Sequence, residues 1–293
     1  MREKKTYTQA GPAAGGGKRR RKRPRSGTGP GADKDAGGKE GGAASAERIA
    51  KRIARAGLCS RRDAERWILA GRVAVDGVTL ATPAVVVSDA NAITVDGKPL
   101  PEKEARRLWR YHKPAGLLTS HKDPAGRATV FERLPAGMPR VVSVGRLDFT
   151  SEGLLLLTND GGLARALELP ATGWSRRYRV RVHGDVDPAA LKKLEEGITI
   201  SGIHYGPIKA QLDRKQGSNA WLTMTLAEGK NREVRRVMEH LGLKVTRLIR
   251  VAYGPFQLGH LPKGQVDEVP RKALKEQLGS LGGSPGNGPG ARR

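Results

Sequence analysis

The chain has 293 residues, a formal net charge of +25 and 37% apolar residues. A compact protein with so much unbalanced charge repels itself unless a polyanion neutralises it, so nucleic acid is the first partner to expect and an anionic membrane surface the second. No apolar run approaches the roughly 20 residues that cross a bilayer, and the N-terminus lacks the apolar segment of a signal peptide. We therefore expect a soluble, cytoplasmic protein without a membrane partner.

Metal and cofactor sites are not predicted. The single cysteine, Cys59, excludes an internal disulfide, and the six histidines show none of the HxxxH or CxxC spacing typical of zinc sites. The segment GGGKRR around Lys18 has Arg19 where a phosphate loop needs Ser or Thr, and neither a strand nor a helix pattern flanks it. A nucleoside triphosphate site is therefore not expected.

Both ends of the chain are predicted to be disordered. Residues 1–45 are rich in Gly, Ala, Lys and Arg, and they contain too few large apolar side chains to offset the entropy of ordering. Within residues 1–44, 12 Lys and Arg stand against 4 acids, so most of the positive charge belongs to the rest of the chain. Residues 279–293 have a similar Gly- and Pro-rich composition and are predicted to form a second flexible tail.

Residues 46–105 are predicted to form a small helix-helix-strand module with its linker. Ser60 and Asp63 resemble a capping box that opens the second helix, and strand patterns at 73–77 and 93–97 end in Asp-Gly turns. The helices carry many basic residues, among them Arg48, Lys51, Arg52, Arg55, Arg61 and Arg62. These side chains either contact RNA phosphates or form an ordinary solvated face.

Residues 106–278 are predicted to form a second domain of the α+β class with a mainly antiparallel sheet. Strands are expected at residues 108–112, 141–145, 154–158, 177–183, 206–212 and 220–226, and helices near 161–168, 188–196, 231–241 and 271–278. These elements lack the regular strand-helix alternation of a parallel sheet.

The segment VVSVGRLDFTSEGLLLLTNDG, residues 141–161, contains the main candidate for catalysis. Asp148 lies between two apolar strand patterns, where a carboxylate is partly desolvated and needs a cationic partner. The same spacing also fits an aspartate that forms a local side-chain turn. The residues alone leave both interpretations open.

Several segments, in order along the chain, resemble bacterial rRNA pseudouridine synthases of the RsuA/RluB/RluE/RluF family. RIAKRIARAGLCSRRDAERWILAGRVAVDG resembles the S4 RNA-binding domain, and GRLDFTSEGLLLLTNDG resembles the catalytic motif of the family. YHKPAGLLTS, RRYRVRV and EGKNREVRRVMEHLGLKVTRLIRVAYG resemble three further family motifs. The resemblance covers about residues 46–270 and implies an S4-type module followed by a pseudouridine synthase catalytic domain.

The resemblance implies roles for three residues. Asp148 is expected to attack the target nucleoside as a nucleophile or to assist formation of a glycal intermediate. Tyr178 is expected to stack on the displaced uracil, and Lys230 to pair with the Asp148 carboxylate. Without the motif, a tyrosine in a strand is ordinarily a packed residue, and Lys230 is an exposed lysine at a helix start.

Three arginines of the second domain are candidates for RNA contacts. A uridine inside folded RNA must leave its stack, and Arg146 is expected to fill or stabilise the resulting gap, with a loop-supporting salt bridge as the alternative. Arg232 and Arg235 lie on the helix pattern NREVRRVMEH and are expected to line the RNA groove. For each of them, a solvated face is the alternative.

The resulting hypothesis is an enzyme that isomerises one uridine of 23S ribosomal RNA to pseudouridine, because the motifs look most like those of the large-subunit members of RluB type. The alternatives are the same chemistry on 16S rRNA or tRNA, and a non-catalytic ribosome-assembly protein that keeps the fold for RNA binding. The expected partner is ribosomal RNA within an assembly intermediate. The chain is expected to act as a monomer without a cofactor.

Overall fold

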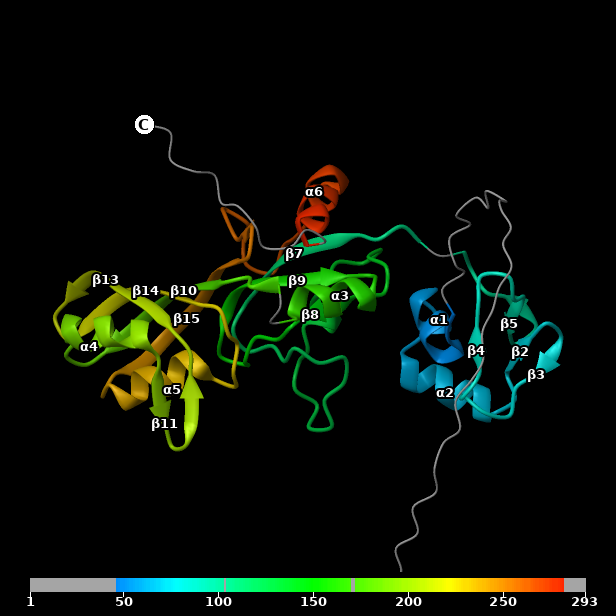
Figure 1. Cartoon of the computed structure of the whole chain (residues 1–293), viewed down its shortest axis with the longest axis horizontal. Helices are drawn as coiled ribbons and strands as arrows, with labels where there is room; N and C mark the ends of the chain where they lie inside the picture. The colour runs from blue at the N-terminus through cyan, green and yellow to red at the C-terminus, as the bar shows by residue number, and fades with distance from the viewer. Residues whose placement is uncertain (1–45, 103, 170–171, 282–293) are drawn as a thin grey trace, which may run out of the picture. The chain divides into compact units, whose positions relative to one another are not determined.

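The computed structural model describes residues 46–102, 104–169 and 172–281 (Figure 1). The predicted N-terminal tail, residues 1–45, and residues 282–293 of the predicted C-terminal tail lie outside the described residues. The described chain folds into a small N-terminal part and a larger C-terminal part. Every helix in the described ranges is too short or too polar to cross a membrane.

The N-terminal part packs two helices against short antiparallel strands. Helices α1 (Ile49–Arg55) and α2 (Arg61–Leu69) follow β1 (Glu47–Arg48), which pairs with β4 (Val86–Val87), and a second sheet has the order β3 (Val78–Thr79), β2 (Val73–Val75), β5 (Ile93–Val95) and β6 (Lys98–Pro99). The capping box is confirmed, because the Ser60 hydroxyl accepts from the Asp63 amide at 3.1 Å and the Asp63 carboxylate accepts from the Ser60 amide at 3.3 Å. Ile53 and Ile68 are fully buried in the core of this part.

The C-terminal part is built on one nine-stranded sheet. Its strands have the order β13 (Ile208–Gln216), β14 (Asn219–Leu226), β10 (Arg176–His183), β15 (Lys244–Tyr253), β9 (Glu152–Thr158), β7 (Leu108–Lys113) and β17 (Val266–Glu268), with β8 (Val142–Val144) paired to β9 and β16 (Phe256–Gln257) paired to β15. Within the described residues, the pairing of β9 with β15 is parallel and the others are antiparallel. The predicted α+β class with a mainly antiparallel sheet is confirmed.

Helices pack on the sheet in two groups (Figure 1). Helix α4 (Pro188–Lys193), its continuation η3 (Leu194–Glu196) and α5 (Glu233–His240) share one hydrophobic core with β10, β14 and β15, whereas α3 (Gly161–Glu168) and α6 (Arg271–Leu281) share another with β8 and β9. The connections contain the turn η1 (Phe131–Arg133) and the hairpin of β11 (Ile198–Ile200) and β12 (Ile203–Tyr205). Helix α6 continues three residues beyond 278, the predicted end of this domain.

Strand β15 is the longest strand of this sheet, and the sequence patterns do not predict it. It lies between β10 and β9, and its register against β10 shifts twice along its length. A bulge places two residues opposite one and so interrupts the alternation of apolar and polar side chains on which strand prediction depends. A strand at the centre of the sheet therefore has the sequence pattern of an irregular segment.

Strand β9 is buried on both faces and anchors the loop that precedes it. The leucines at 154–157 are fully buried and alternate between the two cores, each contributing about 1.5–3 kcal/mol of hydrophobic stabilisation. At the start of the strand, Gly153 has a φ of +105°, and a Cβ there would lie 2.3 Å from the Arg250 carbonyl oxygen. Glycine therefore permits the close approach of β9 and β15 at the end of the loop 145–151.

Candidate active site

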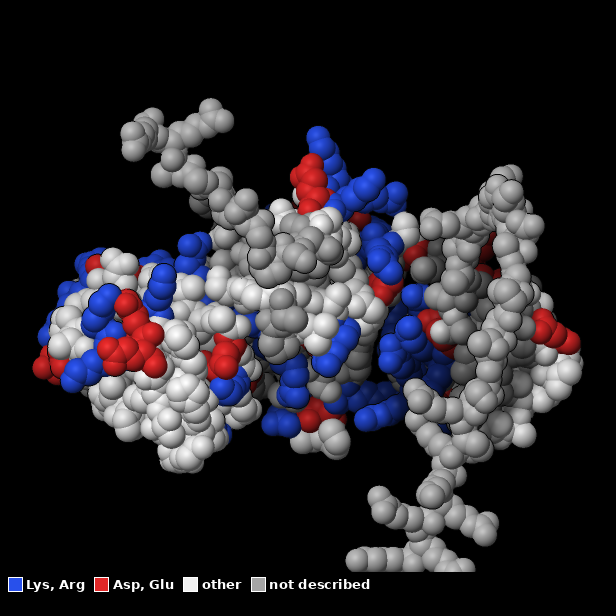
Figure 2. All heavy atoms as spheres, viewed as in Figure 1, with Lys and Arg blue, Asp and Glu red and all other residues white. Residues whose placement is uncertain are grey.

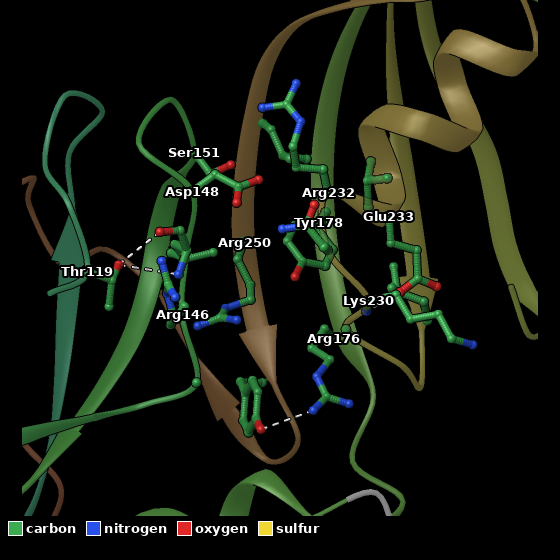
Figure 3. Close-up of a pocket in the computed structure, with 18 of the residues that line it drawn as sticks. Thr119, Arg146, Asp148, Ser151, Arg176, Tyr178, Lys230, Arg232, Glu233 and Arg250 are labelled. Atoms are coloured by element: carbon green, nitrogen blue, oxygen red, sulfur yellow. Dashed lines mark hydrogen bonds between the residues drawn. The ribbon is translucent and has the colours of Figure 1, made fainter. Parts of the chain in front are cut away.

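A cavity of about 690 Å³ lies beside the central strands of the C-terminal part. Its walls come from the loop 145–151, from β10 and β15, and from the turn that precedes α5, which are far apart in the sequence (Figure 3). The three predicted catalytic residues, Asp148, Tyr178 and Lys230, all line this cavity. The fold thus brings the three motifs that contain them to one place.

The loop that carries Asp148 is held through its backbone. Its carbonyl oxygens accept hydrogen bonds from three groups of one neighbouring segment, namely Lys113 Nζ, the Gly116 amide and the Thr119 hydroxyl. The Ser151 amide closes the loop on itself by donating to the Asp148 carbonyl at 3.0 Å. These contacts leave the half-buried Asp148 carboxylate on the cavity wall, so the loop presents it in a fixed position.

Lys113 is a fully buried lysine beneath this loop. Its ammonium group donates to the carbonyl oxygens of Pro114, Asp148 and Ser151 at 3.0, 3.1 and 2.9 Å. Burial lowers the pKa of Lys113 to about 8, although the charges of Asp148 and Glu152 act in the opposite direction. A cation therefore lies close to Asp148 in a region that water does not reach. Lys113 belongs to the segment YHKPAGLLTS, and the family resemblance of that segment implies no role for it.

Arg235 approaches the same loop from helix α5. It is 9% exposed, and its guanidinium donates to the carbonyl oxygens of Val245 and Thr150 at 3.2 and 3.4 Å. Burial and the neighbouring Arg232 lower its pKa, while the negative charge of Asp148 acts to raise it. The predicted position of Arg235 in an RNA groove is therefore wrong, because the side chain packs inward and supports the Asp148 loop.

Lys230 does not pair with Asp148. Its ammonium group binds the Glu228 carboxylate and donates to the His204 carbonyl oxygen at 2.8 Å. In Figure 3 the side chain points away from Asp148. The predicted ion pair is not formed, because Lys230 lies in the turn before α5 and these two acceptors are nearer to it. The cations that act on Asp148 are instead Lys113 and Arg235.

Tyr178 forms part of the cavity wall between the Asp148 loop and α5 (Figure 3). It is 9% exposed, and on β10 it pairs with Met224 of β14 and Arg250 of β15. Its ring therefore has a fixed place in the sheet and belongs to the hydrophobic core. A base that enters the cavity would meet this ring near the Asp148 carboxylate.

Two buried charged residues outside the predicted catalytic trio also line the cavity; the sequence indicates Arg250 as a further RNA-groove arginine and assigns no role to Glu233. Arg250 is 3% exposed, and its Nε donates to the Leu154 carbonyl at 2.8 Å. Glu233 is equally buried, burial raises its pKa, and one carboxylate oxygen accepts from the Lys230 amide at 2.8 Å. Arg250 Nη2 and the other Glu233 oxygen have no hydrogen-bond partner among the described residues. A substrate with polar edges can satisfy such groups.

Arg146 and Arg232 are the exposed arginines of the cavity. Arg146 follows Gly145, which has a φ of +67° and whose amide donates to the Glu168 carboxylate at 2.6 Å. Arg232 has a φ of 52°, in the left-handed region, at the residue that precedes α5. Both backbones are fixed while both side chains face solvent, as the predicted RNA contacts require.

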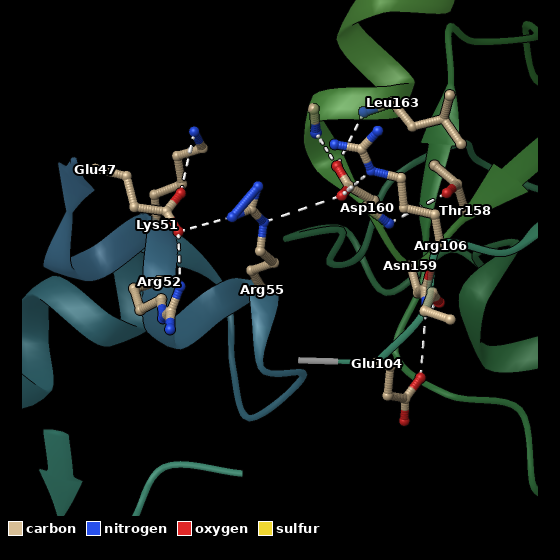
Figure 4. Close-up of polar contacts among 12 residues, drawn as sticks. Glu47, Lys51, Arg52, Arg55, Glu104, Arg106, Thr158, Asn159, Asp160 and Leu163 are labelled. Atoms are coloured by element: carbon tan, nitrogen blue, oxygen red, sulfur yellow. Dashed lines mark hydrogen bonds and ion pairs between the residues drawn. The ribbon is translucent and has the colours of Figure 1, made fainter. Parts of the chain in front are cut away.

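The basic residues of the N-terminal part fall into two sets. Lys51, Arg52 and Arg55 surround the buried Glu47 carboxylate at 3.1, 3.6 and 2.8 Å (Figure 4). These three side chains are therefore engaged in an ion-pair cluster and contribute less free positive charge than predicted. The exposed set comprises Arg48, Arg61 and Arg62. Figure 2 shows Lys and Arg side chains, with acidic side chains among them, on the visible surface of the described residues.

The side chains of the described residues do not form a metal-binding cluster. Within the described residues, no three His, Cys, Asp or Glu side chains gather at one place. The walls of the cavity instead offer hydrogen-bond donors, acceptors, one carboxylate on a rigid loop and the aromatic rings of Tyr178 and Tyr253. This arrangement suits a polar, planar ligand and chemistry at a carboxylate.

Comparison with known proteins agrees with this geometry. The RNA pseudouridylate synthase family matches residues 107–240, and the S4 domain matches residues 47–93. A crystal structure of a pseudouridylate synthase has the same fold, with a TM-score of 0.57 and 24% identity over 78% of this chain and 99% of that chain.

Sequence similarity to known proteins extends over most of the chain. An uncharacterized RNA pseudouridine synthase of Rickettsia felis is 50% identical over 230 residues, which cover 78% of this chain and 100% of that protein. The ribosomal large subunit pseudouridine synthase B of Yersinia pestis is 44% identical over 237 residues, which cover 78% of this chain and 74% of that protein. From this similarity and the shared order of domains, the chain belongs to the RNA pseudouridine synthase family, in the branch with an N-terminal S4 domain.

Proposed function

We propose that this chain isomerises a specific uridine of 23S ribosomal RNA to pseudouridine, with Asp148 as the catalytic residue. The observation that carries the proposal is the Asp148 carboxylate, held by a rigid loop on the wall of a cavity that it shares with Tyr178. The similarity to relatives named large subunit pseudouridine synthase B supports the choice of ribosomal RNA as substrate. The S4 domain supports RNA as the partner.

The reaction needs a group that can act on the ribose and then leave. The bond from ribose C1′ to uracil N1 breaks, the base turns, C1′ bonds to C5, C5 loses a proton, and N1 ends protonated. The Asp148 carboxylate either bonds to C1′ or removes the proton from C2′ to give a glycal, and both routes begin with an ionised carboxylate. Atoms and electrons balance without an oxidant, a reductant or a donated group.

Two buried cations lie close to the loop that carries Asp148. Lys113 and Arg235 approach the loop from different elements, and each interacts electrostatically with the Asp148 charge. Because both are held by backbone carbonyls, their positions do not change when the substrate arrives. They stabilise the carboxylate as a leaving group when the new C1′ to C5 bond forms. We assign this role to them in place of Lys230.

The target uridine has to leave its stack to reach Asp148, because a carboxylate cannot reach C1′ and C2′ inside a folded helix. We propose that the uracil lies against the Tyr178 ring. Arg146, exposed two residues before Asp148, is suited to fill the gap in the RNA, since its planar guanidinium can stack on bases and bind phosphate. Arg232 extends the same contact on the opposite wall of the cavity.

The S4 domain is proposed to supply affinity through its exposed set of arginines, Arg48, Arg61 and Arg62. Ribosomal RNA is modified where ribosomes assemble, so we propose that the enzyme acts on an assembly intermediate in the cytoplasm. The family resemblance alone implies that it acts as a monomer.

The deciding experiment compares the parent chain with an Asp148→Asn variant on transcripts of 23S rRNA, 16S rRNA and tRNA, with chemical mapping of pseudouridine. We expect one modified position in 23S rRNA with the parent, no product with the variant, and RNA affinities within a few-fold of each other. If the parent modified only 16S rRNA or only tRNA, that RNA and not 23S rRNA would be the substrate. A folded parent chain that binds rRNA but modifies none of the transcripts would favour the binding-only alternative.

A further inference from the structure

The half of the sheet formed by β13, β14, β10 and β15 has two very different faces. On β10, Tyr178, Val180 and Val182 point into the core beneath α4 and α5. Successive side chains of a strand point to opposite faces, so the residues between them lie on the other side. Those residues are Arg177, Arg179 and Arg181, and all three are exposed.

The neighbouring strands add further polar and basic residues to this side. The pairing registers place Lys209 and Arg214 of β13, Thr223 and Trp221 of β14, and Arg247 of β15 in rows with the arginines of β10. We call this surface the open face and define it by Arg177, Arg179, Arg181, Lys209, Arg214 and Trp221. The core face opposite it carries the cavity with Tyr178.

The charge of the open face is poorly balanced within the chain. Arg181 lies directly opposite Arg247 in the pairing of β10 with β15, and Arg214 is in the same row. Like charges opposite one another destabilise a sheet. Glu152 neutralises Arg247 through contacts at 2.9 and 3.0 Å, which leaves the charges of Arg181 and Arg214 without a carboxylate partner among the described residues.

The chemical groups exposed on the open face determine which ligand it can bind. Arg179 covers the Trp221 ring, with its guanidinium carbon 4.8 Å from the ring centroid, so the aromatic ring is not available for stacking on bases. Apart from one carboxylate, Asp213, which accepts from the Thr223 hydroxyl at 2.8 Å, the exposed groups are mainly guanidinium, ammonium and amide groups. Such groups bind phosphate and sugar oxygens and do not read base edges. A sugar-phosphate backbone fits this surface.

We propose that the open face is a second RNA-binding surface that holds the backbone of a helical segment of the substrate RNA, separate from the segment that enters the cavity. The proposal rests on the proposed function for the identity of the RNA. Because the open face and the cavity lie on opposite sides of one sheet, a single short stem-loop cannot fill both. The enzyme should therefore prefer a long, folded rRNA fragment over a minimal stem-loop that contains the target.

The test uses a triple variant, Arg179→Gln, Arg181→Gln and Arg214→Gln, in the full chain. A matched control removes the same charge from helix α6, with Arg271→Gln, Lys272→Gln and Lys275→Gln. Affinity is measured over a range of salt concentrations for a long 23S fragment and for the shortest stem-loop that is still modified. Each lost phosphate contact lowers the slope of log K against log salt by about 0.9.

For the long fragment, we expect the open-face variant to lose roughly 2 to 3 from this slope and the control to lose much less. For the stem-loop, both variants should keep the parental slope and the parental kcat. Equal losses of slope in the open-face variant and in the control would mean that only net charge matters, which would contradict the proposal. A parental slope in the open-face variant would also overturn it. Loss of binding only to assembly particles that contain ribosomal proteins would assign the open face to a protein partner.

A second measurement separates binding from folding and from catalysis. If the arginines repel one another, Arg181→Gln should raise the Tm of the RNA-free protein at low salt, and the gain should vanish at high salt. An unchanged or lower Tm at low salt would contradict the unbalanced-charge argument. Affinity and Tm do not depend on product formation, so a failure of the proposed function would appear separately, as absence of pseudouridine with the parent chain.

Discussion

Lys113 offers the most direct test of how the active-site loop is stabilised. In a Lys113→Met variant, three carbonyls within 3.1 Å lose a donor. The Asp148 carbonyl keeps the Ser151 amide, so two buried acceptors, those of Pro114 and Ser151, are left unsatisfied at a cost of about 1–3 kcal/mol each. The same change removes a buried charge whose pKa is lowered from 10.5 to about 8, which returns about 3 kcal/mol. We expect a net loss of about 1 kcal/mol in the free energy of unfolding.

The pH dependence of this group has a defined sign. The folded pKa is about 8 and the unfolded pKa about 10.5, so between these values the unfolded chain binds more protons than the folded chain. The contribution of Lys113 to the free energy of unfolding therefore increases as pH rises from about 8 to about 10.5. Activity should change in the opposite direction, because the neutral amine no longer supports the charge of Asp148.

The assay is kcat against pH for the parent and Lys113→Met, with chemical unfolding at the same pH values. We expect the parent kcat to fall above about pH 8 and the variant to have a kcat at least ~10-fold lower, with a flatter profile in this range. A parent kcat that stays constant to pH 9.5, or a variant with the parental kcat, would refute the assignment. If the free energy of unfolding falls by the same amount in both proteins over this pH range, Lys113 does not contribute to stability as described.

Three further outcomes follow from the positions of the other basic residues. In single-turnover assays, Lys230→Met should keep the rate constant within about 5-fold of the parent, because its ammonium binds Glu228 rather than Asp148. A loss of about 100-fold would mean that Lys230 does pair with Asp148, as the sequence predicts. Arg235→Met should lower both kcat and the free energy of unfolding, because the Asp148 loop loses one of its two buried cationic donors. We expect urea unfolding to show a loss of about 3 kcal/mol. In the S4 domain, steady-state kinetics should show a higher half-saturating RNA concentration with little change in kcat when glutamine replaces Arg48, Arg61 and Arg62. An equal loss from changing Lys51, Arg52 and Arg55 would contradict the division into engaged and exposed sets.

Local patterns in the sequence determine much of the architecture. The alternation in RRYRVRV corresponds to β10, the capping box at Ser60 opens α2, and the run of four leucines forms the buried strand β9. These features depend on neighbours within a few residues, where hydrogen-bond and side-chain periodicity is regular. The position of Asp148 between two apolar strands is a local signal of the same kind, and the motif resemblance identifies it as a catalytic candidate.

The electrostatic support of Asp148 is decided only by the tertiary structure. A lysine is ordinarily expected at the surface, and Lys113 is buried because carbonyl groups from a loop some 35 residues away converge on its ammonium group. Lys230 and Arg235 are five positions apart in one motif, and the turn into α5 decides that the first faces Glu228 and the second the Asp148 loop. The bulges of β15 likewise conceal the central strand in the sequence, because register is set by pairing partners that lie far along the chain.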